Sequence, residues 1–144
     1  VEKIRGGMCF AVAALATVAL AFSPGKTLSD FAPIHLFESL HREYPKARIF
    51  NYREFGGALE YVGSPEWRVF TDGRLYLYDQ ATFDTYHAVA IARDSELLNR
   101  VVNEHDLFVL HCSYHAALIV RLRERSDLRA VSESECIAVF SKVG

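Results

Sequence analysis

The sequence lacks an excess of basic residues. Its 144 residues include 16 Lys and Arg against 18 Asp and Glu, which gives a formal net charge of -2. A protein that binds nucleic acid through the phosphates needs a basic surface, so this composition excludes nucleic acid as a partner. Hydrophobic residues are not lacking, at 51% of the chain, and this excludes an intrinsically disordered protein. The length fits one domain.

Cysteine is also scarce, with three residues in the chain. Cys9 lies in an apolar N-terminal stretch, so Cys112 and Cys136 are the pair that could form a disulfide in the rest of the chain. The spacing does not decide whether they pair, and two buried thiols are favoured. Cys112 as a nucleophile would need a helix N-terminus to lower its pKa and a positioned base, and the sequence shows no such base.

A metal site is not expected from the histidines. His111 and His115 are four residues apart, but the first is expected to end a strand and the second to begin a helix. Two histidines placed in this way do not share a helix face, and the sequence offers no further ligands to complete a site. The sequence therefore predicts neither a metal nor a cofactor.

The N-terminal segment is strongly apolar. Residues 8–22 contain fourteen apolar residues and one threonine, and the surrounding uncharged stretch would span about 27 Å as a helix. A bilayer core is about 30 Å thick, so a short transmembrane helix is predicted. Lys3 and Arg5 fit both a transmembrane helix that enters from the cytoplasmic side and a secretory signal.

The chain begins with Val1 rather than Met, which favours the last transmembrane helix of a larger protein over a signal peptide. We therefore expect a transmembrane helix over residues 1–23 and a linker over 24–33. Residues 34–144 are then expected to form an extracytoplasmic domain.

The periodicity after residue 33 alternates between helix and strand. Helices are predicted over 34–44, over 82–104 as a pair broken near residues 93–95, and from Ser113 to about Arg125, with Ser95 and Ser113 as N-caps. Strands are predicted at 47–50, 67–70 and 107–110, and a closing hairpin at 128–132 and 136–141. This order predicts an α/β three-layer sandwich with a mostly parallel sheet and a C-terminal antiparallel hairpin.

Polar residues follow the predicted strands. Ligands of parallel α/β sheets bind beyond the carboxyl ends of the strands, so the candidate ligand-binding residues are Asn51, Asp72, Arg74 and His111. Arg74 could bind a phosphate or carboxylate, while Asp72 or Asn51 holds a sugar hydroxyl. The favoured alternative is structural: Asp72 accepts hydrogen bonds from turn amides, and Arg74 pairs with a nearby carboxylate.

Two motifs carry a family resemblance. The first is Asn51-x4-Gly56-Gly57-x-Leu59, and the second is Val69-Phe70-x-Asp72-Gly73-Arg74-x3-Tyr78. With these motifs the chain resembles the C-terminal extracytoplasmic domain of bacterial polytopic membrane proteins of the GT-C glycosyltransferase-like kind. It departs from them at Phe55, where tryptophan is common, and at Thr71, where an aliphatic residue is usual. Within the motifs, Gly56, Gly57, Gly73 and Tyr78 are structural residues.

The resemblance implies a function for the parent protein rather than for this chain. Such proteins transfer a sugar from a lipid-phosphate donor, and their catalytic acid lies in an early membrane loop that this sequence does not contain. We expect a non-catalytic domain on the periplasmic or extracellular side of a bacterial inner membrane. Its expected partners are the membrane portion of the same protein and a lipid-linked sugar or glycan. The alternative is a stand-alone exported or membrane-anchored binding domain.

Overall fold

The computed structural model describes residues 32–134 and 136–143. The predicted transmembrane helix over 1–23 and most of the predicted linker lie outside these residues. Within them, no helix has the length and apolar character that a membrane span requires.

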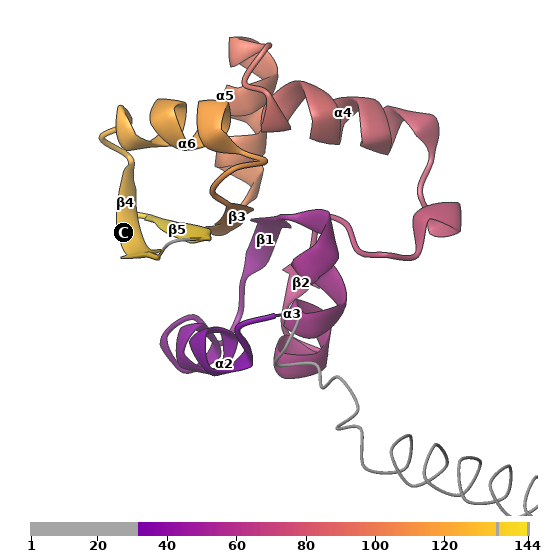
Figure 1. The fold of residues 1–144 in the computed structure, drawn as a ribbon, viewed down its shortest axis with the longest axis vertical. Coiled ribbons are helices and arrows are strands. Elements are labelled where there is room, and N and C mark those ends of the chain that lie inside the picture. The colour runs from indigo at the N-terminus through magenta and orange to yellow at the C-terminus, as the bar shows by residue number, and fades with distance from the viewer. Residues whose placement is uncertain (1–31, 135, 144) are drawn as a thin grey trace, which may run out of the picture. The chain divides into compact units, whose positions relative to one another are not determined.

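The described residues alternate between helices and strands, as the sequence predicted (Figure 1). Single turns of 3₁₀ helix at Arg53–Phe55 and Leu75–Leu77 follow the first and the second strand. In chain order, the elements are α2 (Ile34–Glu43), β1 (Arg48–Asn51), α3 (Gly56–Gly63), β2 (Arg68–Val69), α4 (Gln80–Ala90), α5 (Ser95–Glu104), β3 (Leu107–His111), α6 (Ala116–Arg123), β4 (Leu128–Glu133) and β5 (Ile137–Lys142).

The five strands form one mixed sheet in the order β2-β1-β3-β5-β4. β1 pairs in parallel with β2 and β3, whereas β5 is antiparallel to both β3 and β4. The α/β class and the closing hairpin are therefore confirmed. The expectation of a mostly parallel sheet needs correction, because the last strand lies inside the sheet and makes antiparallel pairs on both of its sides.

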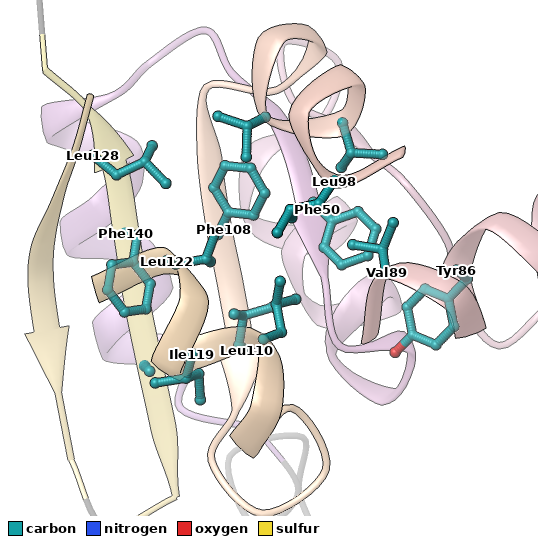
Figure 2. Close-up of a cluster of buried hydrophobic side chains, with 14 residues drawn as sticks. Phe50, Tyr86, Val89, Leu98, Phe108, Leu110, Ile119, Leu122, Leu128 and Phe140 are labelled. Carbon is teal, nitrogen blue, oxygen red and sulfur yellow. The ribbon is translucent and has the colours of Figure 1, made fainter. Parts of the chain in front are cut away.

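Alternation of side chains along the central strands creates two hydrophobic clusters. On β3, Phe108 and Leu110 pack with α4, α5 and α6. Leu107 and Val109, the alternate residues of the same strand, pack with α2 and α3 on the other face. Figure 2 shows the first cluster, in which Phe108 lies among apolar side chains from the neighbouring strands and the covering helices. Successive side chains of a strand point to opposite faces, so a strand covered on both faces must be apolar throughout.

Two predicted N-caps are wrong. The cap of α5 is Asp94, whose carboxylate accepts a hydrogen bond from the Leu97 amide at 2.9 Å, while Ser95 is the first residue of the helix. Helix α6 begins at Ala116 after His115, with no side-chain cap. Ser113 lies in a turn between β3 and α6, and the hydrogen bond from His115 N to His111 O at 2.9 Å closes this turn.

Gly56, the first residue of α3, lies against the backbone of the segment that follows β2. A Cβ atom at this position would lie 2.6 Å from the Cα of Asp72, which no side chain tolerates without a backbone shift. Gly57, the next residue, has open space at the same position. The glycine pair of the first motif thus contains one residue that the packing requires and one that it does not.

This difference predicts opposite effects for two alanine substitutions. Gly56→Ala should lower the free energy of unfolding by about 2 kcal/mol or more, because the backbone at Asp72 must move. Gly57→Ala should be neutral or stabilising by about 0.5 kcal/mol, since alanine favours the helix. Urea denaturation of both variants checks this, and equal effects would contradict the close approach.

Candidate functional site

Asn51 is fully buried at the end of β1 and joins it to the segment that follows β2. Its amide nitrogen donates to the carbonyl oxygen of Thr71 at 2.7 Å, and its amide oxygen accepts from the Phe70 N–H at 3.0 Å. These bonds extend the pairing of β1 and β2 beyond the two residues of β2. Both the nitrogen and the oxygen of the Asn51 side-chain amide are therefore engaged by backbone atoms.

Asp72 and Arg74 form the structural arrangement that the sequence analysis favoured. The buried Asp72 carboxylate accepts hydrogen bonds from the backbone N–H and the Nε of Arg74, each at 2.8 Å. Burial tends to raise the pKa of Asp72, but the hydrogen bonds from Arg74 outweigh it, so the pKa lies below its ordinary value. The same guanidinium also donates to both carboxylate oxygens of Glu60 at 2.8 Å. One cation thus faces two carboxylates.

The rest of the second motif supports this turn. The Tyr78 hydroxyl accepts a hydrogen bond from the backbone N–H of Asp72 at 3.2 Å. Gly73 lies in this turn, but no glycine among the described residues has a positive φ. The side chains of Asp72, Arg74 and Tyr78 hold the turn instead, so this segment does not require a glycine for its conformation.

His111 lies apart from these residues, at the end of β3. β1 and β3 are parallel neighbours, and the chain leaves them towards opposite faces of the sheet: α3 packs in one hydrophobic cluster and α6 in the other (Figure 1). Ligands of α/β proteins usually bind beyond the carboxyl ends of adjacent parallel strands whose helices diverge in this way. The fold therefore places the candidate site between the ends of β1 and β3.

Six rings gather at this point, and we call them the aromatic–histidine cluster. Tyr52 is the hub, with ring centroids 5.1 Å from Phe55, 5.1 Å from His111 and 5.4 Å from Tyr114. Aromatic pairs at these separations stabilise one another beyond their buried area. The members of the cluster are Tyr52, Phe55, Tyr86, His111, Tyr114 and His115.

The buried half of the cluster is a hydrogen-bonded support. His115 has no exposed surface, and its Nδ1 accepts the backbone N–H of His111 at 3.3 Å. The neutral imidazole therefore carries its hydrogen on Nε2, which lies 3.2 Å from the Tyr86 hydroxyl and donates to it. That hydroxyl also accepts the N–H of Arg53 at 3.2 Å. The bonds connect α4 to the segments that follow β1 and β3, and so fix the positions of both strand ends.

Burial keeps His115 neutral, because it lowers the pKa of the imidazole from 6.5 to about 4. In the unfolded chain the histidine takes up a proton as the pH falls below 6.5, whereas in the fold it does so only near 4. The unfolded state thus binds more protons between these values, so acidification through this window destabilises the fold.

We expect His115→Gln to remove this pH dependence. The wild-type protein should lose about 3 kcal/mol of stability from this group between pH 6.5 and pH 4, in addition to the effects of its other groups. The control is His35→Gln, which replaces a histidine whose side chain is 96% exposed. Urea denaturation across this range measures the difference, and parallel profiles for wild type and His115→Gln would contradict the assignment.

The exposed half of the cluster consists of Tyr52, His111 and Tyr114. Tyr52 and His111 are half-buried, and 44% of Tyr114 is exposed. The backbone N–H of Tyr114 donates to Nδ1 of His111 at 3.4 Å, which leaves Nε2–H of a neutral His111 as a donor. This surface combines ring faces with two hydroxyls and an N–H group, and it contains no carboxylate or ammonium.

Cys112 lies beside this surface but is not prepared as a nucleophile. Helix α6 begins four residues later, so the expected helix N-terminus does not reach the thiol. Burial and the neighbouring Cys136 raise the pKa of Cys112, and its Sγ donates to the carbonyl oxygen of Ser134 at 3.5 Å. A raised pKa reduces the thiolate that nucleophilic catalysis requires.

The sequence analysis found one member of the exposed surface and missed two. His111 was predicted because it ends a strand, whereas Tyr52 and Tyr114 were not selected. The available signal was an aromatic residue shortly after each of the two strands. Tyr52 follows β1, and Tyr114 with the adjacent His115 follows β3. Recognising it required the knowledge that these two strands are neighbours, which only the sheet order gives.

Comparisons complete the description of the site. Among the residues that the structure describes, no group of three or more His, Cys, Asp or Glu side chains could hold a metal ion. No family model, curated protein or solved structure matches the chain. The assignment of function therefore rests on the chemistry of the site and on the resemblance of the two motifs.

Proposed function

We propose that the described residues form a non-catalytic glycan-binding domain of a membrane glycosyltransferase-like protein. The observation that carries the proposal is the exposed surface of the aromatic–histidine cluster at the diverging ends of β1 and β3. Ring faces of this kind stack on the C–H faces of a sugar, while hydroxyls and an imidazole N–H bind its hydroxyl groups. Apolar ring faces combined with a few polar groups are the usual composition of a small-ligand site.

The charge distribution favours the sugar over a phosphate headgroup. A phosphate site needs a free arginine or lysine, and Arg74 is held between Asp72 and Glu60. Arg53, which is adjacent to Tyr52, is paired with Glu54 at 3.1 Å. An uncharged glycan needs no such cation, so the neutral surface of the cluster suits it better.

The ionisable groups around the site support a binding role rather than catalysis. Asp72 is held by Arg74, His115 stays neutral down to about pH 4, and Cys112 is protonated at neutral pH. General acid–base catalysis needs a group whose pKa lies near the working pH, and these three do not meet that condition. The resemblance places the catalytic acid of such proteins in an early membrane loop, so we assign the sugar transfer to the membrane portion of the parent protein.

The proposal predicts that a neutral oligosaccharide binds at the cluster. The full chain is held in a detergent whose headgroup carries neither sugar nor phosphate, and is titrated with maltotriose while NMR shifts are recorded. Saturable shifts are expected at Tyr52, His111 and Tyr114. Tyr114→Ala should weaken binding by about tenfold, because it removes one stacking ring.

Tyr76→Ala is the matched control, since Tyr76 is 85% exposed in the turn after β2 and outside the cluster. It should leave the Kd for maltotriose unchanged. The proposal is contradicted if glucose 1-phosphate, and not maltotriose, shifts the resonances of Asp72 and Arg74. Equal weakening by the two tyrosine substitutions would also contradict it.

The membrane location is tested separately. Alkaline phosphatase is active only where its disulfides form, so its fusion after residue 144 reports the compartment of the C-terminus in bacterial cells. The proposal predicts an active fusion in the membrane fraction. An inactive fusion of normal abundance would place the domain in the cytoplasm and overturn the extracytoplasmic assignment.

A further inference from the structure

Cys112 and Cys136 lie opposite each other where β3 and β5 separate. The last pair in the register of these strands is His111 with Ile137, and the two cysteines are the next residues on each side. The backbone N–H of Cys112 donates to the carbonyl oxygen of Cys136 at 2.9 Å, so the antiparallel pairing continues to this position. The cysteines are 24 positions apart in the sequence, and the antiparallel pairing of β3 with β5 brings them together.

The pairing geometry suits a disulfide. In a hydrogen-bonded antiparallel pair, opposite side chains lie on the same face of the sheet and the Cα atoms are about 5.5 Å apart. Disulfides usually join Cα atoms about 4.4–6.8 Å apart. Both thiols are free in this structure, but the expectation of two buried thiols is wrong, because Cys112 is half-buried and Cys136 is exposed. The pair is therefore within range of a bond and accessible to a redox partner.

We propose that Cys112 and Cys136 are a thiol–disulfide switch that a low-molecular-weight disulfide oxidises. The exposed Cys136 thiolate attacks one sulfur of oxidised glutathione, which expels one glutathione thiolate and leaves a mixed disulfide on Cys136. The Cys112 thiolate then attacks Sγ of Cys136 and expels the second glutathione thiolate. Two cysteine thiols are oxidised, one glutathione disulfide is reduced to two thiols, and the two cysteine protons pass to solvent or to the glutathione thiolates.

The disulfide would join two turns that already contact each other through hydrogen bonds from Cys112 to Ser134 and Cys136. One is the turn from Cys112 to His115 before α6, and the other connects β4 to β5. A covalent link between them closes a loop that contains α6 and β4, and such a link stabilises a fold chiefly by restricting its unfolded state. An exposed disulfide is also readily reduced, so the switch is reversible. This inference does not depend on glycan binding.

The test uses the full chain with Cys9→Ser in detergent, equilibrated with buffers of increasing oxidised-to-reduced glutathione ratio. After acid quenching and alkylation, mass spectrometry should find Cys112 linked to Cys136 within one chain, with the loss of two hydrogen atoms. The oxidised protein should melt at least about 5 °C above the reduced one, and dithiothreitol should reverse both changes.

Cys136→Ser in the same background is the matched control, because it keeps the backbone hydrogen bond and removes one thiol. It should show no internal link and no rise in melting temperature. The proposal is overturned if both thiols are fully alkylated in excess oxidised glutathione. It is also overturned if only mixed disulfides or links between chains form, or if Cys136→Ser gains the same thermal stability.

Discussion

Burial of β3 on both faces is the constraint on which the rest of the domain depends. Phe108 and Leu110 must be covered by α4, α5 and α6, while Leu107 and Val109 must be covered by α2 and α3. Neither helical layer can be removed without exposing one side of the central strand to water. The two layers also separate the helices that follow β1 and β3, and this separation opens the strand ends where the candidate site lies.

The site is organised as an exposed surface on a buried base. Tyr86 and His115 are buried and hydrogen-bonded, and their bonds reach the segments after both parallel strands. Tyr52, His111 and Tyr114 rest on this base and face outward. Rings held in this way lose little conformational freedom on binding, which favours recognition of a ligand by stacking. The neutral state of His115 supports the site at physiological pH. Protonation of His115 under acid conditions weakens it.

At the strand ends, the polar residues that sequence patterns suggest for ligand binding are held in structural contacts, and aromatic residues form the exposed surface instead. Asn51, Asp72 and Arg74 are the chemically versatile side chains, yet each is engaged by the backbone or by an opposite charge. A buried carboxylate must be paired, and the nearest cation satisfies that need before any ligand can. The tyrosine side chains are uncharged and need no paired ion, so Tyr52 and Tyr114 remain available at the surface.

Local patterns were enough to predict four of the described helices (α2, α4, α5 and α6), the strands and the α/β class, because the hydrophobic period changes between helix and strand. The continuous apolar run of β3 is also typical of a strand that is buried on both faces. The sheet order was not contained in these patterns, since a strand can pair with either neighbour without changing its own sequence. Only the tertiary structure placed β5 beside β3, brought Cys112 opposite Cys136, and joined Tyr52 to Tyr114, because each of these contacts links residues that are distant along the chain.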